Sequence, residues 1–327
     1  NYKTENSFYI DLLFSYENST SIFNYKNSHY HKIKNIMSNI DNLSISIEQK
    51  THIKTHWATY CLHRKNYNDA FSFINYINDI DGPNVNRNNM SFFSHSDINK
   101  TLLLYDGGGI GDKIMFSRFI TIVCEKYKNN NIILFVDDNI VYLLNKLFNN
   151  IINIRVVSYS MPFMIGNYDY HCSFITLMKY LNITYEEITF YPLFKSIDFT
   201  NNSNIQRQII QDIKSSKKLT YIFNWKGNIK NPHELHNRSM KLNNAIPLFN
   251  ISNIDWIVIT KNITTDEKQI LDQHNVKYYG DVLDNKDNCF EDSIEVIKNV
   301  DGFVSTDTSL VHLSANLDIK TYVLLTS

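Results

Sequence analysis

Apolar residues recur at helical spacing in the first part of the chain. Tyr30, Ile33, Ile36, Met37 and Ile40 lie one to four residues apart, and this spacing places them on one face of a helix. The same part has no glycine-rich turn and no alternation of apolar and polar residues. The pattern therefore predicts a small all-helical domain over residues 1–98.

Part of this helical region resembles one tetratricopeptide repeat. Within residues 56–83, Ala58, Tyr67, Ala70, Ile74 and Pro83 have the spacing of such a repeat. Helix pairs of this kind stack on their neighbours to bury a face that neither helix buries alone. A plain helical cap accounts for the same residues, and both interpretations stay open.

From Lys100 onward, short apolar runs alternate with helical stretches. This alternation predicts a parallel sheet with crossover helices. The runs of the first series are TLLLY, NIILFV and IRVVSY, with helices expected at 114–127 and around 143–148. The runs of the second series are LTYIFNW, DWIVIT, VKYYG, DGFVST and TYVLLTS, with helices expected at 265–274 and 291–300. The chain is thus predicted to be an α/β protein with two doubly wound, Rossmann-like domains, at 99–200 and 201–327. A polar linker near 195–215 joins them.

Composition adds to this picture mainly by exclusion. The 327 residues are 43% hydrophobic and 20% charged, as in folded globular proteins. The 32 basic and 33 acidic residues nearly cancel, so no overall field attracts nucleic acid. No apolar run approaches the roughly 18 residues of a membrane span, and no signal pattern is present, so a cytosolic protein is expected. The chain starts at Asn1, so its true start is expected upstream.

The four cysteines, Cys61, Cys124, Cys172 and Cys289, are far apart and are expected to be reduced thiols.

Four of the nine glycines gather between a predicted strand and a predicted helix. Gly107, Gly108, Gly109 and Gly111 fall within YDGGGIGDKIMF. Glycine permits positive φ and close backbone approach, so this loop is suited to present main-chain N–H groups to a ligand at a helix start. Asp112 follows directly. Its residue type and place fit either a helix-capping acid or a catalytic carboxylate.

A second candidate segment, TDTSLVH at 306–312, follows the apolar strand DGFVS and precedes a helix. Asp307, Thr308 and Ser309 are able to cap that helix. Its free N–H groups are equally suited to hold a diphosphate, because the helix dipole favours an anion there. Ligands of open parallel sheets bind beyond the carboxyl ends of the strands, where both this segment and the glycine loop are predicted to lie.

Three segments together resemble the heptosyltransferase-like enzymes of glycosyltransferase family 9, and most closely members with a tetratricopeptide region in front. They are GxGDxxxFxRF at 109–119, NWKGNIKNPHELHNRSMKL at 224–242 and FEDSIEVIKNVDGFVSTDTSLVHLSANLDIKTYVLL at 290–325. The resemblance implies a GT-B fold, in which two Rossmann-like domains face a cleft, with the acceptor on the first domain and the nucleotide sugar on the second. It also implies an inverting transfer of a sugar from a nucleoside-diphosphate sugar to a glycan, lipid-linked or protein acceptor, with no cofactor and no metal.

The resemblance also implies roles for single residues. Asp112 matches the family's general base on the acceptor hydroxyl. Gly109 and Gly111 belong to the loop that contacts ligand. Asp307, Thr308, Ser309 and His312 match the loop that holds the donor diphosphate. Arg238, with Lys226 as second choice, matches the basic position of the middle segment; the alternative for Arg238 is a plain surface charge.

Some features depart from the family or are discounted. The family's second domain normally continues beyond the strand TYVLLTS, and the middle segment is longer and richer in histidine than usual. His233 and His236 are three residues apart but have no third ligand, so no metal site is expected. Asp79-Ile80-Asp81 spells the D-x-D string of metal-dependent glycosyltransferases, yet it lies in the helical region. Two other functions stay open. One is a catalytically degenerate module that binds a sugar or a protein, and the other is a sugar-nucleotide epimerase on the same fold.

Overall fold

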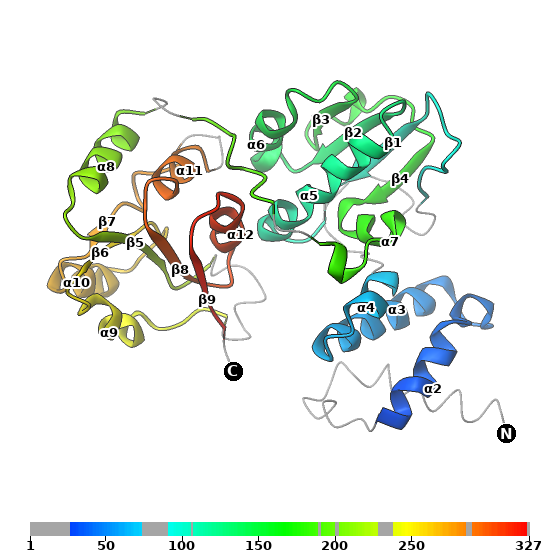
Figure 1. Cartoon of the computed structure of the whole chain (residues 1–327), viewed down its shortest axis with the longest axis horizontal. Helices are drawn as coiled ribbons and strands as arrows, with labels where there is room; N and C mark the ends of the chain where they lie inside the picture. Colours follow the sequence, from blue (N-terminus) through cyan, green and yellow to red (C-terminus); the bar gives the residue numbers. More distant parts are fainter. Residues whose placement is uncertain are drawn as a thin grey trace.

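The chain folds into a helical region followed by two α/β domains (Figure 1). The computed structural model describes residues 27–73, 91–105, 107–188, 191–199, 203–227, 238–285 and 290–325. The helical region contains α2 (Asn27–Met37), α3 (Ile47–His63) and α4 (Tyr67–Phe73). Ser46 and Gln49 form a capping box that satisfies backbone N–H groups at the start of α3. Ile74, Pro83 and the Asp79–Asp81 string lie outside the described residues, so the tetratricopeptide repeat stays a prediction.

The first α/β domain has a four-stranded parallel sheet in the order β3-β2-β1-β4. Its elements are β1 (Thr101–Tyr105), α5 (Ile110–Lys126), β2 (Asn131–Val136), α6 (Asp138–Phe148), β3 (Ile154–Ser158), β4 (Tyr170–Ser173) and α7 (Leu177–Leu181). One face of the sheet packs against α5, α6 and α7. On the other face Leu103, Tyr105 and Phe135 pack against Tyr159 and Ile165 of the β3–β4 connection.

The second α/β domain has a five-stranded parallel sheet in the order β7-β6-β5-β8-β9. Its elements are α8 (Asn204–Ser215), β5 (Leu219–Asn224), α9 (Ile246–Phe249), β6 (Ile254–Val258), α10 (Thr265–Gln273), β7 (Lys277–Tyr278), α11 (Glu291–Ile297), β8 (Gly302–Thr306), α12 (Ser309–Asn316) and β9 (Thr321–Leu324). Helices α8, α11 and α12 contribute to the core on one face, and α9 and α10 contribute to the core on the other. The predicted fold class, two Rossmann-like α/β domains behind a helical region, is confirmed.

Two local predictions were wrong. Helix α5 begins at Ile110, four residues before the expected 114, so Gly111 is helical rather than part of the loop. Helix α8 occupies most of the expected linker at 195–215. It begins after Ser203, whose side chain accepts a hydrogen bond from the N–H of Gln206. Its buried face contains Ile209, Ile213 and the polar Gln206. Because one buried position is polar, the sequence lacks the apolar spacing that would have predicted this helix.

One hydrophobic cluster runs through all three regions. It includes Trp57 of α3, Phe119 of α5, Phe194 between the domains and Leu313 of α12. Helices α5 and α12 pack against each other across the two α/β domains (Figure 1). The connecting segment 191–199 is also held by the second domain, because the N–H of Phe194 donates to the carbonyl of Asn316 at 3.0 Å. The regions therefore share a core.

Three of the four cysteines, Cys61, Cys124 and Cys172, are buried free thiols as expected, and Cys289 lies outside the described residues. Burial raises the pKa of the Cys124 thiol to about 12. Among the described helices, none has the length and apolar character needed to cross a bilayer.

Candidate functional site

The glycine loop ends in a helix cap made by Asp112. Its Oδ2 accepts a hydrogen bond from the N–H of Gly109 at 2.8 Å, which satisfies one of the open donors at the start of α5. Gly108 has φ +74°, and a Cβ there would lie 2.5 Å from Asp112 Oδ2. Glycine at 108 is therefore required both by its backbone conformation and by the Asp112 carboxylate.

Gly111 brings this loop against the second candidate segment. A Cβ at Gly111 would lie 2.8 Å from His312 Cδ2 and 3.4 Å from Ser309 Cα. The absent side chain thus allows α5 of the first domain to meet the first turn of α12 in the second. The Arg118 guanidinium extends the same contact by donating to Asn316 Oδ1 at 3.2 Å.

Charged groups from both domains surround His312. Its Nε2 lies 3.7 Å from Asp307 Oδ1. Burial lowers the pKa of His312, the carboxylates of Asp307 and Asp112 act against this, and the cations of Arg118 and Arg238 add to it. The predicted residues Asp112, Arg238, Asp307 and His312 therefore lie in one electrostatic neighbourhood.

A cavity of about 450 Å³ opens beyond the carboxyl ends of β5, β6 and β8. The order of the sheet reverses between β5 and β8, and ligands of open α/β sheets bind at such a switch point. Thr308 and Ser309, two residues of the segment predicted to hold a diphosphate, line this cavity. The other lining residues are Asn224, Lys226, Gly227, Ile259, Thr260, Lys261, Asn262, Asp284, Phe290, Ser293 and Leu310.

Among the residues that the structure describes, no side chain caps the start of α12. Thr308 stands at the N-cap position in an extended conformation, yet its hydroxyl makes no capping bond. That hydroxyl instead accepts from Asn224 Nδ2 at 3.2 Å and lies 3.2 Å from Ser305 Oγ. The capping role expected for Asp307, Thr308 or Ser309 is therefore not seen, and the diphosphate role stays a prediction.

Lys226 lines the cavity but is engaged internally. Its Nζ donates to Glu267 Oε2 at 2.6 Å and to the carbonyl of Asn262 at 3.2 Å. Burial alone would raise the pKa of Glu267; hydrogen bonds from Lys226, the N–H of Thr264 and Trp225 Nε1 hold it below its usual value instead. The middle segment's His233 and His236 lie outside the described residues, and Arg238 is half-buried.

Sequence reasoning missed several residues that shape this cavity. Asn224 is a polar residue at the end of a strand and reads as an ordinary boundary, although it is fully buried. Lys261 donates to the carbonyls of Leu283 and Asp284. Burial raises the pKa of Asp284, whose Oδ1 accepts from the N–H of Asp292 at the start of α11. No sequence signal distinguished these residues, because their roles depend on long-range contacts.

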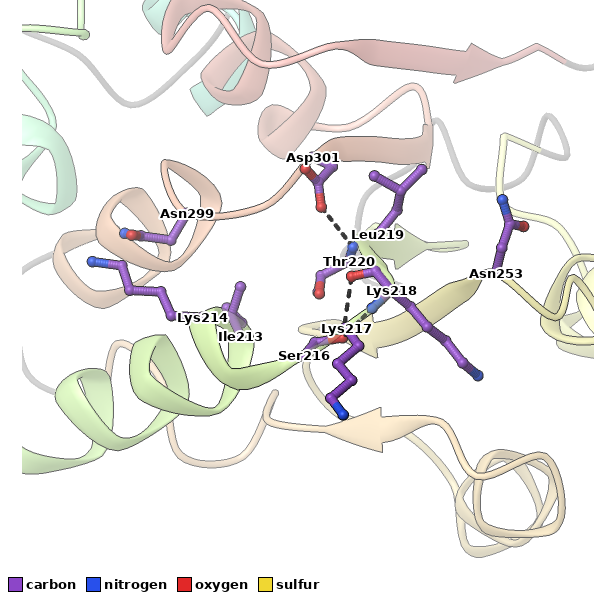
Figure 2. A pocket seen from close by; sticks show the side chains of 10 residues that line it. All are labelled: Ile213, Lys214, Ser216, Lys217, Lys218, Leu219, Thr220, Asn253, Asn299 and Asp301. Carbon is purple, nitrogen blue, oxygen red and sulfur yellow. Dashed lines mark hydrogen bonds between the residues drawn. The ribbon is translucent and has the colours of Figure 1, made fainter.

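A second cavity, of about 520 Å³, lies at the amino-terminal edge of the second sheet (Figure 2). Its wall is held by Asp301, which accepts from the N–H of Thr220 at 2.7 Å. The side chains of Lys214, Lys217 and Lys218 extend in different directions (Figure 2). They do not converge on one ligand, so we assign this cavity no site. The described residues also contain no cluster of three metal-ligating side chains.

Comparisons with known proteins give distant similarities. No protein-family model matches the sequence, and no curated protein matches it. A glycosyl transferase family 9 structure from Veillonella parvula matches with a TM-score of 0.48 and 10% identity over 70% of this chain and 82% of the other. The E. coli ADP-heptose LPS heptosyltransferase II matches with a TM-score of 0.42 and 12% identity over 69% and 86%. The iron-containing dodecameric glycosyltransferase TibC, from enterotoxigenic E. coli H10407, matches with a TM-score of 0.42 and 10% identity over 69% of this chain and 58% of the other.

Proposed function

We propose that this chain is a glycosyltransferase that moves a sugar from a nucleoside-diphosphate sugar to an acceptor hydroxyl. The observation that carries the proposal is the contact between the first turns of α5 and α12, the helices that begin at the two segments singled out for chemistry. Gly111, next to Asp112, lies against Ser309 and His312 of the other domain. An acceptor on the first domain and a donor on the second would therefore meet between a carboxylate and an uncapped helix start.

Asp112 is the proposed general base. Its Oδ2 is committed to the Gly109 N–H, and Oδ1 has no hydrogen bond within the described part of the chain. An acceptor hydroxyl bound to Oδ1 gives up its proton as its oxygen attacks the anomeric carbon. The new C–O bond forms as the bond from that carbon to the diphosphate oxygen breaks. Direct displacement of this kind inverts the anomeric configuration.

The start of α12 is proposed to receive the leaving diphosphate. Its first N–H groups carry no cap from the side chains of the described residues, and the helix dipole favours negative charge there. Ser309 adds a hydroxyl, and Arg238 lies close enough to His312 for the two side chains to interact electrostatically. Fixed donors aimed at developing charge are an effective form of catalysis. We propose that this set acts without a metal ion.

Asp112→Asn is the direct test. Asparagine retains an oxygen that accepts the Gly109 N–H, so the start of α5 keeps its cap while the base is removed. A positioned base contributes on the order of 10² to 10⁴ in rate, and the expected loss of transfer is of that size with an unchanged melting temperature. Transfer at nearly the parent rate would overturn the role of Asp112.

One observation favours a second function, a GT-B module that binds its ligand without turnover. Asp112 and Lys226, two of the predicted site residues, both make internal structural bonds. A thermal-shift screen with UDP, GDP, ADP, CMP and their sugars separates the two functions when it is combined with a transfer assay. A shift that is lost in Ser309→Arg without any transfer favours the binding module, whereas measurable turnover excludes it.

A further inference from the structure

Asn224 joins three elements at the floor of the candidate donor cavity. Its Nδ2 donates to Ser305 Oγ at 3.0 Å and to Thr308 Oγ1 at 3.2 Å. Its Oδ1 accepts from Thr260 Oγ1 at 2.7 Å. The side chain is 2% exposed. One amide at the end of β5 thus connects β8, the second residue after β6 and the residue that precedes α12.

The same amide determines what the Thr308 hydroxyl does. Threonine at an N-cap normally accepts a hydrogen bond from a backbone N–H of the first turn. Here the Thr308 hydroxyl is occupied by Asn224 and Ser305, and no capping bond forms. Ser305 Oγ donates to the carbonyl of Thr306 at 2.7 Å, so this chain of hydrogen bonds ends on a backbone carbonyl.

We propose that Asn224 is a positioning residue of the donor cavity. It fixes the wall formed by Thr308 and Ser309, and it keeps the Thr308 hydroxyl turned away from the start of α12, so that a phosphate group of the donor takes the place of a cap. The proposal rests on the proposed function, because it presumes a nucleoside diphosphate in this cavity. A buried polar network that is fully satisfied specifies one arrangement of its members, as the cavity wall requires.

A double replacement distinguishes this role from plain stabilisation. Asn224→Leu releases the Thr308 hydroxyl, which then caps α12 and competes with the phosphate. Asn224→Leu combined with Thr308→Val removes that competitor, since valine has no hydroxyl. The positioning role therefore predicts weak binding in the single variant and partial recovery in the double variant. A purely structural role predicts that the double variant binds no better than the single one.

The experiment measures binding of ADP, GDP, UDP and CDP to the full chain by calorimetry, and then follows the tightest of them through the variants. Loss of one hydrogen bond to a charged group weakens binding by about tenfold or more. In Asn224→Leu the Thr308 hydroxyl takes an N–H of α12 from the phosphate, so a loss of this size is expected. Thr321→Val is the matched control. It removes a partly buried hydroxyl pair with Ser314 in the same domain, at the start of β9, and should leave the affinity unchanged.

Each outcome has one meaning. If the parent binds none of the four nucleotides, the proposed function fails. If the parent binds and a folded Asn224→Leu binds within twofold of it, the role of Asn224 is overturned while the proposed function stands. If Asn224→Leu does not fold, Thr260→Val replaces it, because that change removes only the hydroxyl that orients Asn224 Oδ1. Because Thr260 itself lines the cavity, weaker nucleotide binding by Thr260→Val supports the proposal when Thr308→Val partly restores it. Weaker binding without recovery, or parent-like binding, overturns it.

Discussion

Gly111 and His312 occupy one contact between the two α/β domains, and no side chain larger than hydrogen fits between them. The Cβ of any other residue at 111 would lie 2.8 Å from Cδ2 of the His312 ring, closer than Cβ contacts in proteins come. A glycine that sequence reasoning assigned to ligand contact thus has a packing role between the two domains.

Gly111→Ala should destabilise the fold by about 1–3 kcal/mol, because overpacking forces the His312 ring or the two helices to move. Gly109→Ala is the matched control. A Cβ at Gly109 meets Asp112 Oδ2 at 3.7 Å, an ordinary contact, and its φ of −76° suits alanine. Urea denaturation of both variants checks the difference. Equal stabilities for the two would show that the contact between α5 and α12 is looser than described.

Lys226→Met should lower the free energy of unfolding by about 1–3 kcal/mol, because it leaves the Glu267 carboxylate without its cation in a largely buried place. Lys226 is 10% exposed and Glu267 is 19% exposed. If the lysine is structural, nucleotide affinity per folded molecule stays at the parent value. A large loss of affinity with unchanged stability would instead favour the phosphate-binding role first expected for Lys226. Chemical denaturation and calorimetry together make this distinction.

Protonation of His312 should destabilise the fold as the pH falls. Its folded-state pKa is lowered below the ordinary 6.5, mainly by burial, so the unfolded chain binds the proton more readily. The contribution to stability is present above pH 6.5 and is lost as the pH falls through the folded pKa. The free energy of unfolding is measured between about pH 7.5 and about pH 5 for the parent and for His312→Gln. The variant should lose less stability over this range; parallel curves would contradict the prediction.

The helical region should be energetically coupled to the first α/β domain through Tyr67 and Tyr185. Their rings stack with centroids 4.2 Å apart, and Asn68 beside them accepts from the N–H of Tyr185 at 2.8 Å. A double-mutant cycle with Tyr67→Leu and Tyr185→Leu should give a coupling of about 0.5–1.5 kcal/mol. Additive effects of the two changes would show that the stacking contributes nothing beyond its buried area.

Sequence patterns predicted the central strands well, because buried parallel strands read as continuous apolar runs. The runs TLLLY and NIILFV coincide with β1 and β2. Strand β4 was not predicted because its sequence, YHCS, is not an apolar run. Helix α8 was not predicted because the polar Gln206 takes part in its buried face.

For the site, the glycine loop and TDTSLVH were found from composition and position. The Asn224 network was not found, since Thr260, Ser305 and Thr308 lie 36, 81 and 84 residues from Asn224 in the sequence. Local patterns report which residues share a helix face or a strand. They do not report which side chains meet from separate strands.

The hydrophobic cluster that runs from Trp57 to Leu313 has a consequence for how such a chain is able to evolve. A gene fusion that exchanged the helical region for another would uncover apolar side chains of the first α/β domain, and an exchange of the second domain would uncover α5. Either exchange would expose apolar surface, which favours aggregation. The three regions are therefore expected to be inherited together, and substitutions at their contacts to be accepted in compensating pairs.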